Sequence, residues 1–218
     1  MTSAIFKNIR QLTLASASPR RRELALRLGL PVEVISVDAD EKRTSNDPAR
    51  VSMEIAESKA KAVLAKRGYF PGEVILTADT SVWLDGENGG PAEMLGKPVD
   101  ADDARRMLRA LSGRAHRVFT GFTLVYRTAA TNRLRLDDHS VETRVFVAKL
   151  TDAEIDEYIR SGDPLDKAGA YGIQGPFAIH IERIIGNYDN VVGLPLQAVY
   201  AALKAADNDF SADWYLRG

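Results

Sequence analysis

Apolar and polar residues follow two periods along the chain, one typical of strands and the other typical of helices. Short apolar or alternating runs predict β-strands, at residues 12–15, 32–37, 74–78, 118–126, 141–147 and 177–185. Runs with an apolar residue every three or four positions predict helices, at residues 19–28, 51–67, 100–111, 151–159 and 195–206. Helices alternate with strands at the start and strands cluster later, which predicts an α/β fold with a mixed sheet.

The chain contains no internal repeat, low-complexity tract or linker rich in Pro, Gly and Ser. Its 218 residues suit one large domain or two small lobes that share a core. We therefore expect residues 1–218 to form a single domain. Hydrophobic residues make up 45% of the chain, which excludes a disordered protein because such chains have too few apolar residues to form a core.

Charge and cysteine content narrow the function. The 29 basic and 30 acidic residues give a formal net charge of −1, so the chain lacks an overall basic field for nucleic acid. It contains no cysteine, which excludes disulfides, thiolate zinc sites and a cysteine nucleophile. No apolar run approaches the ~18 residues of a membrane span, and the N-terminus lacks a signal peptide pattern. We therefore expect a cytoplasmic protein with no nucleic-acid or membrane partner.

The start of the first predicted helix is the strongest local signal. Ser18 suits the N-cap and Pro19 the first helical position. Arg20, Arg21 and Arg22 then place positive charge where the helix dipole favours negative charge. An anion docked here would meet free backbone N–H groups, a hydroxyl and guanidinium groups. The alternative is a solvated basic face, and the sequence leaves both interpretations open.

Two charged residues fall on apolar surfaces. Lys59 projects from the apolar face of the helix predicted at 51–67, and Asp79 directly follows the strand predicted at 74–78. A lysine that faces inward needs a partner or a bound anion. An acid at the end of a buried strand is suited to hold a divalent cation or to take a proton from water. The alternatives are a lysine whose stem covers apolar surface and a carboxylate that caps a turn.

Three loops add candidate ligands of a phosphorylated substrate. The acidic loop at 38–41 follows a predicted strand and could supply a second metal ligand, although a single loop acid is more often solvated. Lys97 could reach a phosphate, but five residues separate Gly90 from Gly96, which excludes a P-loop. The segment 166–175 contains three glycines that would let its backbone approach a ligand, or it is a glycine-rich turn.

Taken together, these segments resemble the Maf family of nucleotide pyrophosphatases. The matching segments are 14–21, 40–41, 56–60, 78–80, 96–98, 111–113, 166–175 and 192–195. One such segment would mean little by itself. The complete set follows the order of the family and covers nearly the whole chain, so the resemblance is specific.

The resemblance implies a fold related to that of inosine triphosphatases, with an elongated mixed β-sheet, flanking helices and two lobes around a cleft. It implies a cytoplasmic homodimer that uses Mg²⁺ or Mn²⁺ and cuts a nucleoside triphosphate to its monophosphate and pyrophosphate. Proteins of this family are also linked to arrest of cell division.

The resemblance further implies the roles of individual residues. Asp79 matches the catalytic acid, the proposed proton acceptor, and Glu41 matches an acidic position near the metal, so both are expected metal ligands. Four residues match those that handle the triphosphate: Ser18, Arg21, Lys59 and Lys97. Water would attack the α-phosphorus and pyrophosphate would leave.

Three further positions separate the subfamilies, and here they are Arg20, Thr80 and Gln174. These residue types resemble the branch that cleaves dTTP and UTP. The branch that acts on 7-methyl-GTP carries a bulky aromatic residue, Gln and Glu instead. We therefore expect dTTP and UTP to be the substrates, with the side chain of Gln174 offering a donor and an acceptor to the base edge.

Two departures from the family and two other functions stay open. Residues 87–94 form a longer stretch than the usual turn before Lys97, and residues 1–10 extend past the usual start. The chain could instead be a pyrophosphatase for modified nucleotides such as 7-methyl-GTP. It could also be a nucleotide-binding regulator of division with weak catalysis, against which the intact set of Asp79, Lys59 and Lys97 argues.

Overall fold

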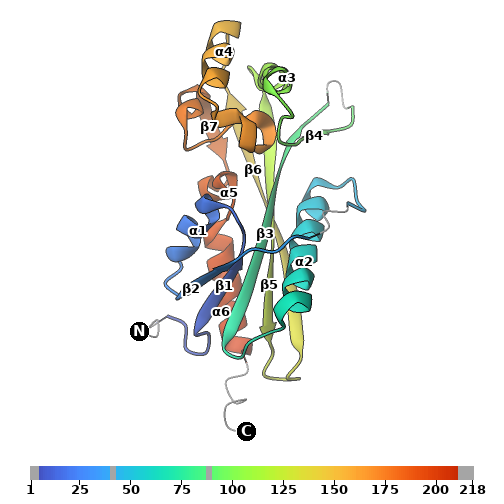
Figure 1. Cartoon of the computed structure of the whole chain (residues 1–218), viewed down its shortest axis with the longest axis vertical. Coiled ribbons are helices and arrows are strands. Elements are labelled where there is room, and N and C mark those ends of the chain that lie inside the picture. The colour runs from blue at the N-terminus through green and yellow to red at the C-terminus, as the bar shows by residue number, and fades with distance from the viewer. Residues whose placement is uncertain (1–4, 40–42, 87–89, 211–218) are drawn as a thin grey trace. The chain divides into compact units, whose positions relative to one another are not determined.

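The computed structural model describes residues 5–39, 43–86 and 90–210. These residues form a mixed α/β fold around a seven-stranded sheet (Figure 1). The strands are β1 (Gln11–Ala15), β2 (Val32–Ile35), β3 (Glu73–Leu84), β4 (Glu93–Leu95), β5 (Ala115–Arg127), β6 (Leu134–Val147) and β7 (Ile181–Ile185). Their order in the sheet is β2-β1-β3-β5-β6-β7, with β4 paired to β3.

Helices accompany the sheet along the whole chain. The α-helices are α1 (Pro19–Leu26), α2 (Pro48–Arg67), α3 (Ala101–Leu111), α4 (Asp152–Arg160), α5 (Tyr188–Val192) and α6 (Leu196–Asp209). Short 3-10 helices occupy η2 (Asp163–Asp166), η3 (Ala168–Ala170) and η4 (Pro176–His180). A mixed sheet with flanking helices confirms the predicted fold class. In the part of the chain that the structure describes, no helix is both long and apolar enough to cross a bilayer.

The chain divides into two compact units. Unit 1 comprises Met1–Asp79, Thr120–Val141 and Gly193–Gly218, and unit 2 comprises Thr80–Phe119 and Glu142–Val192. The strands β3, β5 and β6 each contribute residues to both units.

Unit 1 is built on parallel strands. The strand β1 is parallel to both β2 and β3, and Leu14 pairs with Val34 on one side and Leu76 on the other. From Leu12 onward, every residue of β1 is buried. The strand is therefore covered on both faces, as strands of parallel sheets usually are. Its one polar residue after Gln11 is Thr13, whose buried hydroxyl donates a hydrogen bond to Oε2 of Glu73.

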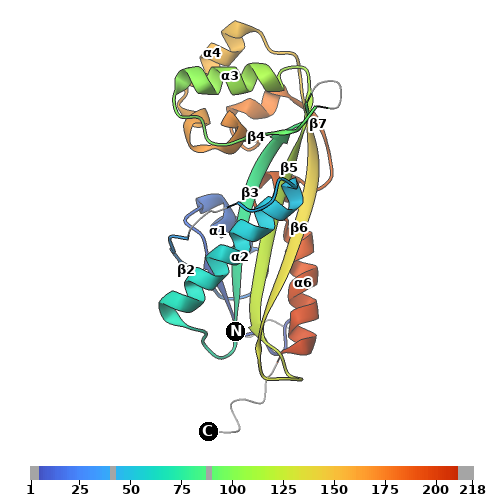
Figure 2. The same ribbon diagram turned by 90° about the vertical axis from the view of Figure 1, so that its right-hand side faces the viewer.

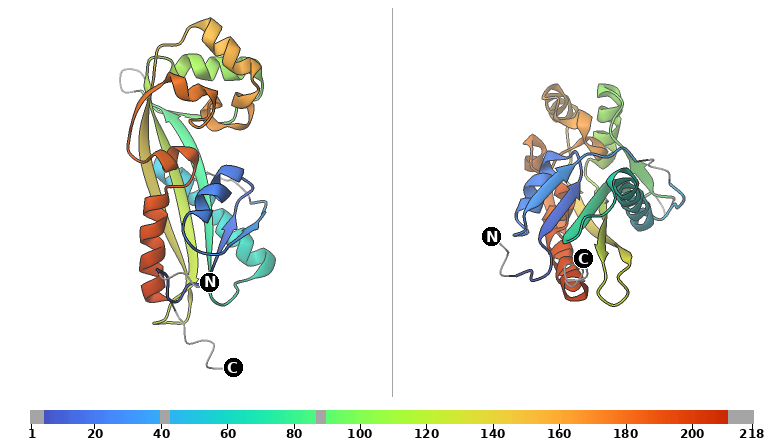
Figure 3. Two further views of the ribbon diagram at one scale, coloured as in Figure 1. Left: turned by 90° about the vertical axis from the view of Figure 1, so that its left-hand side faces the viewer. Right: turned by 60° about the horizontal axis from the view of Figure 1, so that its bottom comes forward.

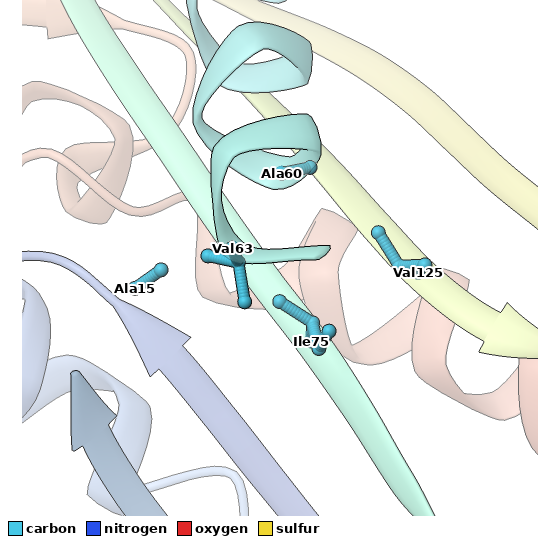
Figure 4. Packing of buried hydrophobic residues seen from close by; sticks show 5 residues of the cluster. All are labelled: Ala15, Ala60, Val63, Ile75 and Val125. Carbon is cyan, nitrogen blue, oxygen red and sulfur yellow. The ribbon is translucent and has the colours of Figure 1, made fainter. Parts of the chain in front are cut away.

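The helix α2 covers one face of these strands. Ala60 and Val63 of α2 pack in a buried cluster with Ala15, Ile75 and Val125 (Figure 4). The helix α6 lies on the other face, as Figures 2 and 3 show. The burial of an amphipathic face, rather than helix propensity, supplies most of the stability of such a helix.

A glycine lets α2 approach β5 backbone to backbone. A Cβ atom at Gly121 of β5 would lie 2.3 Å from the carbonyl carbon of Ser52 and 2.4 Å from the amide nitrogen of Met53. Real Cβ atoms do not come this close to another backbone, so the distance between α2 and β5 depends on the absent side chain at this position.

The residues before β1 are held by α6. The carboxylate of Asp207 is buried and accepts hydrogen bonds from the backbone N–H groups of Lys7, Asn8 and Ile9, at 2.9, 2.8 and 2.9 Å. The part of the N-terminal extension that the structure describes therefore has a defined anchor in unit 1.

Unit 2 contains the helix pair α3 and α4. The apolar face of α3 is buried, namely Ala104, Met107, Leu108 and Leu111. A capping box of Thr151 and Glu154 opens α4. Arg105 of α3 contacts Asp156 of α4 at 2.6 Å. Local signals were sufficient for both helices because their caps and apolar faces lie within each segment.

The strand predicted at 74–78 is longer than expected. The strand β3 continues through Asp79 to Leu84, and Trp83 and Leu84 are buried. Three polar residues in succession, at 79–81, resemble the end of a strand in the sequence. Asp79 consequently lies within a strand and not at the end of one.

The prediction of a strand at 177–185 was wrong for the first half of this range. Residues Pro176–His180 form the 3-10 helix η4, and β7 begins only at Ile181. Pro176 has no N–H for a ladder and its φ is suited to the start of a helix. A further short strand, β4, lies before Lys97, and its Leu95 pairs with Val82 of β3.

Candidate active site

An ion pair joins α2 and β3 in unit 1. The Nζ atom of Lys59 lies 2.7 Å from Oδ1 of Asp79, and the two side chains are only 16% and 17% exposed. The prediction that Lys59 faces inward and needs a partner is confirmed, and this partner is the carboxylate of Asp79. A pair this far out of water is costly to break, because either charge left without the other would be poorly solvated.

The alternation of β3 explains how this pair forms. Successive strand residues point to opposite faces, so Ile75, Thr77 and Asp79 share one face. Ile75 packs in the cluster under α2, and the buried hydroxyl of Thr77 donates a hydrogen bond to the carbonyl of Ala56 on α2 at 2.6 Å. The face of β3 that is turned toward α2 therefore also carries the contact between Asp79 and Lys59.

The start of α1 has the predicted cap. Ser18 is the N-cap, and its hydroxyl accepts a hydrogen bond from the backbone N–H of Arg21 at 3.4 Å. The Nε atom of Arg21 donates to the carbonyl of Gly193 at 2.8 Å. Arg20 and Arg21 are half-buried whereas Arg22 is exposed. The basic first turn is therefore not simply a solvated face, because Arg21 is anchored by the backbone.

The segment 192–195 resembles the family, but the sequence alone indicated no role for it. Its Gly193 has a φ of 125° and its carbonyl is the acceptor for Arg21. Leu194 and Pro195 next to it are buried. In the sequence, a glycine followed by apolar residues could have indicated a structural turn. It could not have indicated that the carbonyl of this glycine accepts a hydrogen bond from Arg21.

Thr80 lies next to Asp79 on β3 and belongs to unit 2. Because consecutive strand residues point to opposite faces, the side chain of Thr80 does not share the face of Asp79. Thr80 is half-buried. Its predicted part in substrate selection stays a prediction.

Two other predicted motifs are joined within unit 2. Lys97 is exposed and follows β4 directly after Gly96. The carbonyl of Gly96 accepts a hydrogen bond from the backbone N–H of Gly169 at 3.0 Å. Gln174 is exposed and lies near the end of the same glycine-rich segment. Lys97 and Gln174 therefore belong to stretches of backbone that are connected by a hydrogen bond.

The structure thus distributes the predicted residues over two units. Unit 1 contains Ser18, Arg20, Arg21, Lys59 and Asp79, and unit 2 contains Thr80, Lys97 and Gln174. Glu41 lies outside the residues that the structure describes. Its predicted role as a metal ligand stays a prediction.

The carboxylate of Asp79 is suited to a cation whose other ligands come from the substrate. Among residues 5–39, 43–86 and 90–210, no group of three or more His, Asp or Glu side chains could hold a metal by itself. Mg²⁺ is usually bound through one or two carboxylates together with substrate phosphates rather than by a cage of protein ligands. The carboxylate of Asp79 fits this kind of site.

Comparison with known protein families matches residues 11–206 to the family described as Maf-like protein. This match covers most of the chain. The chain belongs to the Maf family.

Several similar Maf relatives carry one name. The dTTP/UTP pyrophosphatase of Anaeromyxobacter dehalogenans (strain 2CP-1) is 49% identical over 197 residues, covering 90% of this chain and 94% of the relative. The dTTP/UTP pyrophosphatase of Chromobacterium violaceum is 44% identical, covering 87% and 91%. That of Agathobacter rectalis is 43% identical, covering 89% and 96%.

A solved structure also overlaps the chain. The HAM1 protein from Coxiella burnetii is 16% identical, with a TM-score of 0.44, and the match covers 91% of this chain and 100% of that one. This similarity adds nothing to the family assignment, which depends on the sequence matches.

Proposed function

We propose that this Maf protein is a nucleoside triphosphate pyrophosphatase that hydrolyses dTTP and UTP to the monophosphate and pyrophosphate. The observation that carries the proposal is the pair between Lys59 and Asp79, which places a carboxylate and an ammonium 2.7 Å apart on regular elements. The names of the relatives and the residue types at Arg20, Thr80 and Gln174 support the choice of dTTP and UTP.

The Lys59–Asp79 pair can interact with both reactants, which are the triphosphate and the attacking water. When a triphosphate binds, the ammonium of Lys59 can turn from Asp79 to a phosphate oxygen, which leaves a carboxylate oxygen of Asp79 available to water. A water molecule attacks the α-phosphorus in line and transfers its proton to this carboxylate. The bond between the α-phosphorus and the bridging oxygen breaks, and pyrophosphate leaves with the electron pair of that bond.

The remaining chemistry is electrostatic. Lys59, Lys97 and Arg21 offset the charge of the leaving pyrophosphate, and the cap at Ser18 adds backbone N–H groups at the start of α1. A Mg²⁺ or Mn²⁺ ion held by Asp79 and Glu41 would neutralise further phosphate charge. Gln174 would read the base edge. Positioning and charge neutralisation, rather than covalent chemistry, would account for the rate.

We further propose that the protein acts as a cytoplasmic homodimer in housekeeping of the nucleotide pool and has a role in arrest of cell division. Sedimentation at low micromolar concentration measures the oligomeric state directly. A monomer at all concentrations would contradict the homodimer and leave the proposed reaction unaffected.

The deciding experiment measures pyrophosphate release from dTTP, UTP, CTP, the purine triphosphates, ITP and 7-methyl-GTP with Mg²⁺ or Mn²⁺. We expect turnover of dTTP and UTP. The variant Asp79→Asn keeps the shape of the side chain but is a poor base, so we expect its kcat to fall by ~10² or more on every substrate. A loss below about tenfold would contradict the role of Asp79 as the proton acceptor.

A matched control is available in the same unit. Asp138 of β6 is also an acid hydrogen-bonded by a neighbour, because it accepts from the hydroxyl of Thr123 at 2.6 Å. We expect Asp138→Asn to retain activity. Turnover of 7-methyl-GTP in place of dTTP would overturn the proposed substrates, and no turnover of any nucleotide would favour a binding regulator.

A further inference from the structure

The segment from Lys167 to Gly175 holds a strained backbone. Within it, Gly169 has a φ of 72° and Ala170 has a φ of 58°. Ala170 is fully buried. A residue with a Cβ atom rarely adopts this conformation, which persists only where the surroundings impose it. Such strain is concentrated at sites where a segment must present a group in one orientation.

Hydrogen bonds hold this segment from several sides. The backbone N–H of Gly169 donates to the carbonyl of Gly96 at 3.0 Å. The backbone N–H of Gly172 donates to the hydroxyl of Tyr158 at 3.1 Å, and this hydroxyl donates to Oδ2 of Asp163 at 2.5 Å. These contacts fix the backbone before and after Tyr171. The orientation of the Tyr171 side chain therefore depends on the backbone at Gly169 and at Gly172.

Tyr171 is anchored by a histidine that the predicted chemistry does not use. His116 of β5 is 1% exposed, and its Nε2 lies 2.7 Å from the hydroxyl of Tyr171. The two rings are edge to face, with their centroids 5.3 Å apart. Tyr171 also packs on Phe177, with ring centroids 5.0 Å apart. The tyrosine is therefore fixed both by packing and by one directional contact.

The histidine costs stability where it stands. Burial lowers the pKa of His116 to about 4, so the imidazole is neutral at physiological pH. Its other nitrogen, Nδ1, is buried without a hydrogen-bond partner among the described residues. An unpaired buried polar atom is unfavourable. A phenylalanine would fill a similar space without this cost. The hydrogen bond to Tyr171 therefore explains why histidine suits this position better than phenylalanine.

We propose that His116 is a positioning residue, which holds Tyr171 and thereby fixes the segment 167–175 that presents Gln174. The inference rests on the proposed function, because it assigns to this segment the recognition of the pyrimidine base.

The test compares two deletions of one hydrogen bond. His116→Phe removes the hydrogen-bonding imidazole and keeps a ring, and Tyr171→Phe removes only the hydroxyl. In both variants we expect hydrogen exchange at the amides of Gly169 and Gly172 to become about tenfold faster. We expect the ratio of kcat/KM for dTTP over dCTP to fall about tenfold, as it should in Gln174→Ala, while kcat for dTTP changes less than about threefold.

Two further variants separate positioning from general stability. His116→Gln restores an amide that can hydrogen-bond to the hydroxyl of Tyr171, and we expect it to recover the dTTP preference at least in part, even if His116→Phe folds poorly. Thr143→Val deletes a buried hydroxyl of unit 2 that donates to the carbonyl of Asn187 at 3.0 Å. We expect this control to lower stability without changing either the dTTP preference or exchange at Gly169.

The outcomes distinguish the two proposals. A wild-type protein that does not prefer dTTP contradicts the proposed function, and hydrogen exchange then decides the anchor separately. If exchange at Gly169 and Gly172 is unchanged in both deletions, His116 does not fix the segment. If exchange increases but the dTTP preference persists, the segment is fixed by His116 but does not carry recognition, which overturns the inference.

Discussion

Unit 1 and unit 2 present their predicted site residues in different ways. In unit 1, the charged pair of Lys59 and Asp79 comes from the middle of a long helix and the middle of a strand. In unit 2, Lys97 and Gln174 lie on backbone without regular helix or strand structure. Groups that do chemistry gain from rigid elements because small displacements cost rate. Groups that recognise a ligand are more often placed on loops.

The two units also stabilise these groups differently. The pair in unit 1 is charged and held between two packed elements, so removing one partner leaves a poorly solvated charge. The segment in unit 2 is strained at Ala170, and Tyr171 within it is held by a hydrogen bond to the uncharged side chain of His116. We therefore expect substitutions of Lys59 or Asp79 to affect the rate on every nucleotide, and substitutions that loosen the segment 167–175 to affect the choice between nucleotides.

The largest effect on stability should come from the contact of α2 with β5. In Gly121→Ala the added Cβ atom would lie 2.3 Å from the backbone of Ser52, and neither backbone can yield as a side chain would. We expect the free energy of unfolding to fall by about 3 kcal/mol or more, measured by urea denaturation.

Gly96→Ala is the matched control, because a Cβ atom there would meet nothing within 4 Å. It should change the free energy of unfolding by less than about 0.5 kcal/mol. Equal stability of the two variants would show that the packing of α2 does not depend on its close approach to β5.

The next effect is a dependence of stability on pH that comes from unit 2. The pKa of His116 is lowered by burial from 6.5 to about 4, so below pH 6.5 the unfolded chain takes up a proton that the folded chain does not. Its contribution to stability is therefore present above pH 6.5 and is lost as the pH falls toward 4. We expect this loss to reach about 3 kcal/mol.

Urea unfolding of the wild type and of His116→Gln between pH 7 and pH 4 measures this contribution. The variant lacks the titrating group, so its stability should fall less steeply over the same range. Parallel curves would mean that His116 is protonated in the folded protein, which would contradict its burial as a neutral hydrogen-bond partner of Tyr171.

A smaller effect on stability and rate tests the hydrogen bond between β3 and α2 in unit 1. Thr77→Val removes the hydroxyl that donates to the carbonyl of Ala56, while keeping the shape of the side chain. We expect a loss of stability of about 1 kcal/mol. Because Thr77 and Asp79 share a face of β3, we also expect kcat to fall several-fold on all nucleotides alike, and Thr77→Ser to restore it.

Thr13→Val is the control for this prediction. Its hydroxyl is equally buried and donates to Oε2 of Glu73 at 2.6 Å, away from Asp79. It should cost at least as much stability as Thr77→Val but leave kcat unchanged. A fall in kcat of the same size in both variants would mean that Thr77 acts only through stability.

Much of this architecture could be predicted because its signals are local. The N-cap at Ser18, the capping box of Thr151 and the apolar face of α3 each lie within one segment, and the structure confirms them. The inward orientation of Lys59 also followed from the helical period. The continuation of β3 past Asp79 could not be predicted, because polar residues within a buried strand resemble its end until their partners are known.

The sequence by itself determined the fold class, the family and the residue types available for chemistry, because periodicity, caps and ordered motifs are properties of neighbouring positions. Only the tertiary structure decided that Asp79 is the partner of Lys59, that Arg21 is held by Gly193, and that His116 contacts Tyr171. Twenty or more positions separate the members of each pair along the chain. Packing alone brings such residues together, since no local period relates them.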